Sequence, residues 1–250
     1  MKKTEYRLSG DRWGRPLCFA VVADLHGGDP AEVIGALKEA KPDFILMPGD
    51  ILERLNGADD LAHQRGLTLL AEASKLAPTL YSLGNHEDGS TRSWRPKHLR
   101  HHSSDRDHDR GDLERIAQTG AILLDDSYVS VNGIVFGGLS SGLIFEDEKP
   151  RLRWLEAFCR EEAPKVLLCH HPEYYRPYLR DLPVDLIVSG HAHGGQWRFF
   201  GRGVFSPGQG ILPKYTAGVH DGHFVISTGL KKGGRIPRIF NEPEIVFINV

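Results

Sequence analysis

The sequence predicts a mixed, layered α/β sandwich, and three features of its 250 residues support that prediction. In the first half, short apolar runs alternate with longer amphipathic runs, a pattern typical of a parallel sheet with crossover helices. In the second half, short strand-like runs flank Asn132-Gly133, a strong hairpin signal. Apolar residues make up 40% of the chain, which is enough to build a sizeable core.

The first half reads as strand, helix, strand, helix, strand. Asp29 suits the N-cap of the first helix, with Pro30 at its first position. The apolar residues of the second helix recur at helical spacing. We therefore expect strands over 17–23, 44–47 and 79–83, and helices over 30–41 and 61–77.

The second half adds shorter strands and one helix. We expect a helix over 150–162, and strands over 122–124, 128–131, 134–136, 165–169 and 185–189. The tail is expected to form antiparallel strands over 223–227 and 245–250. No internal repeat and no obvious linker divides the chain, so we predict one domain over residues 1–250.

The segment Thr91–Arg110 stands apart from this pattern. It carries six Lys or Arg, three Asp and four His, with almost no apolar periodicity. Two interpretations remain open for this flexible basic insertion: a solvated surface loop, or a basic lid over an anionic substrate.

Charge and composition restrict the class of partner. The formal net charge is −2 and the isoelectric point is about 6.7, so nothing overall favours nucleic acid or an anionic membrane. Cys18, Cys159 and Cys169 form no CxxC motif, which predicts buried free thiols in a reducing compartment. Without a signal-like apolar region or a run near ~18 apolar residues, we expect no membrane span. A cytoplasmic protein is expected, with peripheral membrane association as an alternative.

Metal-ligating residue types recur at the ends of the predicted strands. In open α/β sheets, ligands bind at the carboxyl ends of strands, so these groups are expected to converge. Residues i and i+2 point the same way from an extended backbone, so Asp-x-His and His-x-His can each face one metal. Glycines before several of these groups permit tight turns or close approach. The groups are Asp24-Leu25-His26, Gly49-Asp50, Gly84-Asn85-His86, His170-His171-Pro172 and Gly190-His191-Ala192-His193.

The residue types indicate which ions the site prefers. Imidazole and carboxylate without thiolate suit Zn, Mn or Fe better than Ca or Mg. Two metals about 3.5–4 Å apart can clamp the attacking and leaving oxygens of a phosphoryl transfer. With only Asp24 and Asp50 as anionic ligands, the loaded site stays cationic, which favours a phosphate substrate and lowers the pKa of bound water.

Each of the five groups alone is a weak signal of a metal site. Together and in this order, they resemble the motifs of the calcineurin-like metallophosphoesterase family. The resemblance implies a four-layer α/β/β/α sandwich of mixed sheets and two divalent ions (Mn, Fe or Zn). It implies a first metal on Asp24, His26 and His193, and a second on Asn85, His170 and His191. Asp50 would bridge the two, and a metal-bound hydroxide would attack the phosphorus. His86 would protonate the leaving oxygen or bind the transition-state phosphoryl group.

Three further residues are candidates for substrate contact or support of the ligands. The family motif His-x-Pro assigns His170 rather than His171 as the ligand, so His171 packs or touches substrate. Some branches have an aspartate three residues beyond the bridging one, paired with the catalytic histidine; here that residue is Glu53. Glu53 either orients His86 or is a solvated helix-start residue. Arg54 is a candidate for phosphate binding.

The stretch Gly190–Gln196, followed by Pro207, Pro213 and Tyr215, resembles one phosphodiesterase branch of the family. That branch includes bacterial membrane-associated enzymes and enzymes that hydrolyse UDP-diacylglucosamine. Its members often begin with a membrane segment or export signal, and this sequence shows neither. This absence counts against membrane residence and against a lipid substrate. The expected substrate class is a phosphorylated small molecule or a lipid headgroup, and a phosphodiesterase is expected.

Three alternatives remain. The same site can serve a phosphomonoesterase or a nuclease, but nucleic-acid binding usually requires a basic face, and only residues 91–110 are notably basic. The third alternative is a scaffold, as in a retromer subunit that resembles the family but has a degraded site. Because all seven ligands and His86 are present here, the sequence favours an enzyme.

Overall fold

A computed structural model describes residues 1–9, 11–53, 61–87, 110–141, 152–232 and 237–250. Two six-stranded sheets form its centre. The first sheet runs, in spatial order, β1 (Lys2–Arg7), β16 (Glu244–Asn249), β2 (Cys18–Val21), β3 (Phe44–Pro48), β4 (Thr79–Ser82) and β5 (Ile122–Leu124). The second runs β14 (Gly218–His220), β15 (Phe224–Ile226), β9 (Leu186–Ser189), β8 (Lys165–Cys169), β7 (Ile134–Leu139) and β6 (Ser127–Val131).

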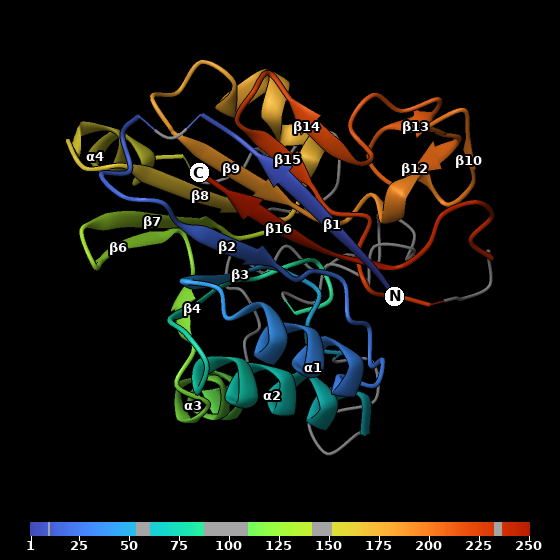
Figure 1. Cartoon of the computed structure of the whole chain (residues 1–250), viewed down its shortest axis with the longest axis horizontal. Coiled ribbons are helices and arrows are strands. Elements are labelled where there is room, and N and C mark those ends of the chain that lie inside the picture. The colour runs from blue at the N-terminus through green and yellow to red at the C-terminus, as the bar shows by residue number, and fades with distance from the viewer. Residues whose placement is uncertain (10, 54–60, 88–109, 142–151, 233–236) are drawn as a thin grey trace, which may run out of the picture.

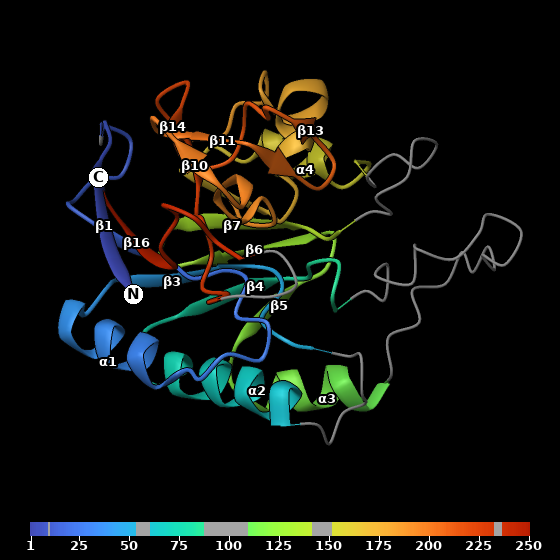
Figure 2. The same cartoon turned by 90° about the vertical axis from the view of Figure 1, so that its right-hand side faces the viewer.

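Helices cover the outer face of each sheet. Figures 1 and 2 show α1 (Ala31–Ala40), α2 (Leu61–Ser74) and α3 (Arg110–Gln118) together on one side of the molecule. On the opposite side lies α4 (Leu155–Arg160), and the short helices Pro172–Tyr174 and Tyr175–Leu179 (η3 and η4) supply buried side chains to the core of the second sheet. The predicted four-layer α/β/β/α sandwich is confirmed.

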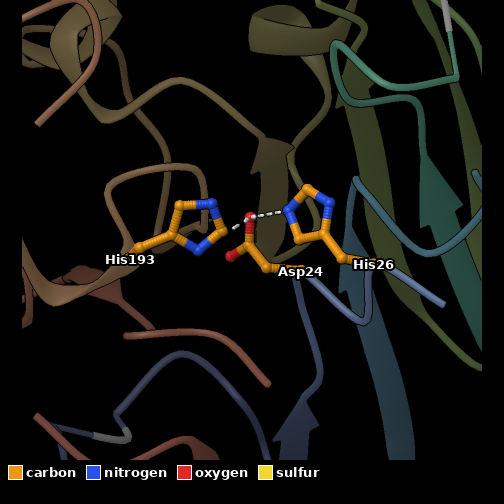
Figure 3. Close-up of side chains that lie close together, drawn as sticks. All are labelled: Asp24, His26 and His193. Atoms are coloured by element: carbon orange, nitrogen blue, oxygen red, sulfur yellow. Dashed lines mark ion pairs between the residues drawn. The ribbon is translucent and has the colours of Figure 1, made fainter. Parts of the chain in front are cut away.

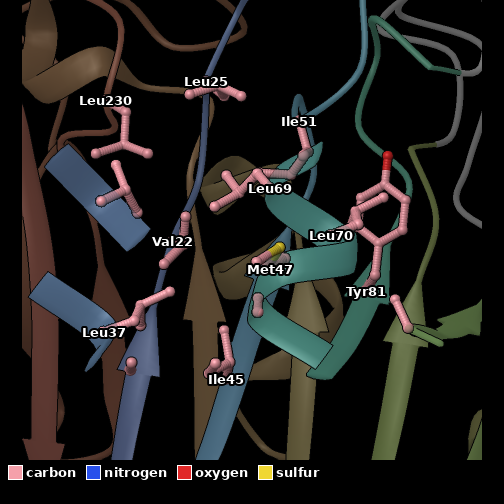
Figure 4. Close-up of a cluster of buried hydrophobic side chains, with 14 of the residues drawn as sticks. Val22, Leu25, Leu37, Ile45, Met47, Ile51, Leu69, Leu70, Tyr81 and Leu230 are labelled. Carbon is pink, nitrogen blue, oxygen red and sulfur yellow. The ribbon is translucent and has the colours of Figure 1, made fainter. Parts of the chain in front are cut away.

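Three apolar cores separate the four layers. The core between the sheets stacks Phe19 of β2 on Phe44 of β3, with ring centroids 5.6 Å apart, and Phe44 meets Phe136 of β7 at 4.9 Å. The core under the first sheet joins residues such as Met47 and Tyr81 to Leu69 and Leu70 of α2 (Figure 4). Burying large side chains on both faces explains why the central strands read as continuous apolar runs.

Strand direction brings the functional loops to one edge. In the first sheet β2, β3, β4 and β5 run parallel to one another. In the second sheet β7, β8, β9 and β15 do the same. The carboxyl ends of these parallel strands therefore open onto shared edges, as the sequence predicted.

Several predicted elements differ in detail. The tail is not purely antiparallel, because β16 pairs in parallel with β1 and β15 in parallel with β9. The helix expected over 150–162 is described only as α4, Leu155–Arg160. Pro30 is the N-cap of α1 rather than its first residue, and the Asp29 carboxylate accepts the Ala31 N–H at 3.0 Å.

Several elements were not predicted, and β1 and α3 are two of them. The edge strand β1 has the polar sequence Lys-Lys-Thr-Glu-Tyr-Arg, which carries no apolar alternation, and pairing with β16 defines it. Helix α3 begins at Arg110, inside the segment expected to be a basic insertion. The rest of that segment, residues 91–109, lies outside the described residues, so neither interpretation of it is tested.

The cysteines are free thiols, but only Cys169 is buried, while Cys18 and Cys159 are half-buried. Among the described helices, none combines the length and apolarity needed to cross a bilayer.

Candidate metal centre

Every predicted metal ligand lies in a loop just beyond a central strand, and these side chains are buried. Asp24 and His170 have no exposed surface, and Asp50, Asn85, His191 and His193 expose less than a tenth of theirs. The His26 side chain exposes 2%. Such deep burial of carboxylates and imidazoles requires compensating partners.

The backbone within the ligand motifs differs from the one predicted. The expectation of an extended backbone at Asp-x-His and His-x-His is wrong. Asp24 has φ 55° and His26 has φ 47°, while His191 has φ 64° and His193 has φ 45°. These left-handed conformations turn the chain sharply within each motif. Asp24 and His26 reach the same cluster from such a turn, whereas His191 and His193 lie in different clusters. Non-glycine residues hold such conformations where the surrounding structure over-determines them, often at functional sites.

Glycines beside the ligands allow close approach, as predicted. A side chain at Gly84 would lie 2.3 Å from the Asp50 carboxylate, and one at Gly190 would lie 2.7 Å from the Asp24 carboxylate. Gly49 has φ 88° and a side chain there would meet the His170 ring at 2.6 Å. Each glycine therefore makes room for a predicted ligand.

The first cluster contains Asp24, His26 and His193. Figure 3 shows the Asp24 carboxylate between the two imidazole rings. Its Oδ1 atom lies 3.8 Å from His26 Nε2 and 4.0 Å from His193 Nδ1. The backbone N–H of His191 donates to the same carboxylate at 3.1 Å, which fixes its orientation.

The second cluster contains Asp50, His170 and His191. Asn85 joins it, because its Oδ1 atom lies 3.2 Å from His170 Nε2. His170 Nδ1 lies 2.7 Å from the Pro48 carbonyl and can donate to it. Donation at Nδ1 leaves Nε2 free to bind a metal, the arrangement that commonly supports ligating histidines.

Asp50 lies between the two clusters. Its Oδ2 atom is 3.3 Å from His26 Nε2 and also 3.3 Å from His170 Nε2. Its other oxygen accepts the His86 backbone N–H at 2.9 Å. One carboxylate oxygen thus faces a histidine of each cluster.

The donor atoms of the two clusters fit divalent metal ions. His26 Nε2, His191 Nε2 and His193 Nδ1 are buried without a hydrogen-bond partner among the described residues. Buried polar atoms are normally satisfied, so unpaired nitrogens that point into one site indicate a missing ligand. Imidazole and carboxylate without thiolate suit Zn, Mn or Fe.

The electrostatics of the site divide its histidines into two kinds. Burial acts to lower the pKa of His26 and His170, but the neighbouring carboxylates raise it to about 9 for His26 and about 10 for His170. Burial lowers the pKa of His191 to about 3, and the charge of His171 acts in the same direction. Burial also lowers the pKa of His193 well below its usual range.

His86 enters neither cluster but stands beside both. Its Nε2 atom lies 3.9 Å from Asp50 Oδ2, and its ring packs edge-on against His26 with centroids 4.3 Å apart. Glu53 Oε1 lies 2.6 Å from His86 Nδ1 and 2.8 Å from His26 Nδ1. Burial acts to raise the pKa of Glu53, but the two histidines lower it to about 2. Of the two interpretations of Glu53, this geometry favours the partner of His86 over a solvated residue.

His171 packs instead of opening toward a substrate. It is 1% exposed, and its Nε2 atom lies 2.5 Å from Ser141 Oγ. Its Nδ1 atom lies 3.2 Å from Glu173 Oε1, and its ring contacts His191 with centroids 4.3 Å apart. Glu173 was not predicted, although it directly follows the His-x-Pro motif. Arg54, the phosphate-binding candidate, lies outside the described residues.

Glu87 is a second residue that the sequence analysis missed. Its carboxylate accepts the backbone N–H groups of Asp50, Ile51, Leu52 and Gly84 at 2.6–3.0 Å, and the Tyr81 hydroxyl at 2.6 Å. Burial and the charge of Asp50 raise its pKa. Glu87 thus ties the loop after β3 to the loop after β4. Its place directly after Gly84-Asn85-His86 was the available signal.

Comparison with known proteins agrees with this geometry. Residues 18–195 match the family model of the calcineurin-like phosphoesterases. An uncharacterized metallophosphoesterase of Aquifex aeolicus (strain VF5) is 26% identical over 91% of this chain and 82% of its own length. Phosphodiesterase YaeI of Escherichia coli (strain K12) is 27% identical over 73% of this chain and 63% of its own.

A solved structure of a Thermus thermophilus protein is similar with a TM-score of 0.48, at 13% identity over 70% of this chain and 82% of its own. The matched family segment covers well over half of the chain and carries every residue of both clusters. The chain therefore belongs to the calcineurin-like phosphoesterase family and is a phosphoric ester hydrolase.

Proposed function

We propose that the chain hydrolyses phosphodiesters with two divalent metal ions, held by Asp24, His26 and His193 on one side and by Asn85, His170 and His191 on the other. The observation that carries this proposal is the position of Asp50. Its Oδ2 atom lies at the same distance, 3.3 Å, from a histidine nitrogen of each cluster. A carboxylate oxygen in that position suits a bridge between two ions.

The rest of the site supports the same division of roles. Two ions bound here would supply an acidic water as the nucleophile and would neutralise charge on the phosphoryl oxygens. Only two carboxylates, Asp24 and Asp50, belong to the two proposed ligand sets. The loaded site therefore keeps a positive charge that attracts a phosphate ester.

His86 is proposed to donate a proton to the leaving oxygen. It stands next to the ligand Asn85 yet its Nε2 atom stays 3.9 Å from Asp50 Oδ2, close to the site without joining either cluster. Glu53 holds its Nδ1 side and aims Nε2 toward the site.

Preference for a diester is the finer part of the proposal. It rests on the resemblance to the phosphodiesterase branch and on the name of the relative YaeI. A phosphorylated small molecule or a lipid headgroup is the substrate class that we propose. The chain covers 63% of the length of YaeI.

The test is a hydrolysis panel on chelated protein to which Mn, Zn or Fe is returned in turn. The panel contains bis(p-nitrophenyl) phosphate, p-nitrophenyl phosphate, cyclic nucleotides and nucleotide pyrophosphates. We expect metal to restore activity at close to two ions per chain, with the diester hydrolysed faster than the monoester. Full activity after exhaustive chelation would refute the metal-dependent proposal, and a faster monoester rate would refute the diester preference.

A further inference from the structure

Two small hairpins beside the metal centre expose large apolar side chains. The hairpins β10–β11 (Arg198–Phe199 with Arg202–Gly203) and β12–β13 (Phe205–Ser206 with Gly210–Ile211) follow the ligand loop and project beyond the two large sheets (Figure 1). We define the apolar lip as Phe199, Phe200, Phe205, Ile211, Leu212 and Phe240. These six are more than half of the large apolar side chains that the described residues expose.

Exposure in the lip is extreme for apolar residues. Phe200 is fully exposed, Ile211 and Phe240 are 80% exposed, and Leu212 is 73% exposed. Phe199, Phe200 and Phe240 line an open groove of about 380 Å³ together with Arg198. These three phenylalanines form a contiguous exposed apolar patch, and patches of that kind mark interaction surfaces.

The backbone holds these side chains outward in strained conformations. Phe200, Leu212 and Phe240 have φ of 50°, 53° and 52°. Phe200 and Gly201, with φ 79°, form the two-residue turn between β10 and β11, where Asn-Gly is the favoured pair. Phenylalanine is disfavoured at the first position of such a turn, and its side chain here is not buried in the core. The stability of the fold therefore does not explain its presence.

Lysine and arginine residues flank the apolar lip in the sequence, and we call them its basic frame. From Gly194 to His220 the sequence contains Arg198, Arg202 and Lys214 but no Asp or Glu. The neighbouring stretch 230–241 adds lysines and arginines, again with no acidic residue. The whole chain has a net charge of −2, so this run of cations is a local feature of the sequence, and its Arg202 and Lys214 are exposed. Aromatic side chains beside cations suit a membrane interface with anionic headgroups.

Hydrogen bonds tie the lip to the metal centre. The Asn241 amide, next to Phe240, donates to the His193 carbonyl at 2.7 Å and to the Gln196 carbonyl at 3.0 Å. Arg198 donates to the Gly194 carbonyl at 2.9 Å. The orientation of the lip is therefore fixed relative to the ligand His193.

We propose that the apolar lip docks on a bilayer that contains anionic phospholipids. The exposed aromatic and aliphatic side chains insert among the headgroups, and Arg202 and Lys214 contact lipid phosphates. Docking itself does not depend on the proposed phosphodiesterase activity, but it would hold the metal centre close to the level of phosphorylated headgroups.

The test is co-sedimentation of the full chain with phosphatidylcholine vesicles, with and without phosphatidylglycerol. The key variant is Phe200→Asn/Phe240→Asn. It removes apolar surface, and asparagine tolerates the left-handed backbone at both positions. Leu61→Asn is the matched control, because Leu61 is 63% exposed but lies on α2, on the other side of the molecule. Arg202→Gln/Lys214→Gln tests the basic frame, with Lys75→Gln on the exposed surface after α2 as its control.

We expect the wild type to bind vesicles that contain phosphatidylglycerol, and the double phenylalanine variant to bind at least roughly tenfold more weakly. The double charge variant should lose roughly fivefold per charge, and both controls should bind like the wild type. All variants should keep the wild-type melting temperature or exceed it, and should hydrolyse a soluble aryl ester at the wild-type rate without vesicles.

Three results would overturn the proposal. The first is no vesicle binding by the wild type, and the second is an equal loss in Leu61→Asn. The third is a wild-type dimer that the phenylalanine variant dissociates without any vesicle binding, which would assign the lip to a second copy of this chain. If the wild type hydrolyses soluble esters but does not bind vesicles, only the membrane-docking proposal is refuted. If it binds vesicles but hydrolyses no ester, only the proposed phosphodiesterase function is refuted.

Discussion

The metal centre and the apolar lip use the same backbone conformation for opposite chemistry. Asp24, His26 and Asp50 have left-handed backbones and side chains buried among polar partners, while Phe200 and Phe240 are left-handed and exposed. Buried charge and exposed apolar surface both depart from the usual distribution of residues. Where a chain makes such departures in strained conformations, the missing partner lies outside the chain: a cation in one region and, as we propose, a membrane in the other.

The largest effect is expected from Asp50→Asn in the metal centre. The amide keeps the shape and the hydrogen bond from the His86 backbone but loses the charge that would bridge two ions. We expect activity to fall by roughly three orders of magnitude or more, with fewer than two ions retained. Elemental analysis and kcat check this, and circular dichroism checks the fold. A variant with two ions and full activity contradicts the bridging role.

His86→Asn should remove proton donation while leaving both ions bound. A nitrophenolate leaves without a proton, but an alkoxide does not, so the loss depends on the leaving group. We expect little change on an aryl diester and a fall of ~10²–10⁴-fold on an alkyl diester. The measurement is kcat/KM for both esters, with metal content determined alongside. An equal loss on both esters would assign His86 to binding of the phosphoryl oxygens.

Glu53→Gln should have a smaller effect, because Glu53 acts through His86 and His26. A glutamine keeps the size but not the charge that holds both rings, so we expect roughly a 10–100-fold loss in kcat and a changed pH profile. Glu72→Gln, which removes a carboxylate paired with Lys75 on the exposed face of α2, is the control and should change nothing. An unchanged pH profile in Glu53→Gln means that the residue only packs.

Metal loading should release protons, because two of the ligand rings carry them. Neighbouring carboxylates raise the pKa of His26 to about 9 and of His170 to about 10, so both rings are protonated at neutral pH without metal. The pKa of His191, lowered to about 3, leaves it no proton to lose. We expect roughly two protons released per chain from these rings, measured by titration calorimetry in buffers of different ionisation enthalpy.

The same competition fixes the direction of the pH dependence. As pH falls, protons compete more strongly with metal for His26 and His170, so activity should decline on the acid side. Added metal should move that decline to lower pH. An acid limb that does not move with metal concentration would mean that some other group controls it.

The smallest expected effect lies in the lip. Phe200→Asn relieves a left-handed phenylalanine at a position that favours asparagine, so the free energy of unfolding should rise by up to about 1 kcal/mol. Urea denaturation measures this. A clear loss of stability would show that Phe200 supports the fold. Its exposure would then no longer indicate a partner outside the chain, as the buried charges of the metal centre do.

The residues at strand ends show which parts of the site can be predicted from the sequence alone. Asp24, Asp50 and His170 follow apolar runs that could be assigned to strands, so their convergence at one edge followed from the direction of parallel strands. Glu87 and Glu173 could not be assigned in the same way, because each acts through contacts with residues distant in sequence. Glu87 binds the loop after β3, and Glu173 contacts the His191 ring at 3.8 Å.

The sequence by itself determined the layered α/β class and the residues that gather at the site, because apolar periodicity and the order of strand-end ligands are local properties. Only the tertiary structure decided that Asp50 lies midway between His26 and His170, that Glu53 joins two histidines, and that Phe200 and Phe240 share one exposed surface. Those relations depend on left-handed turns and on packing between distant loops, and neither leaves a periodic signal in the chain.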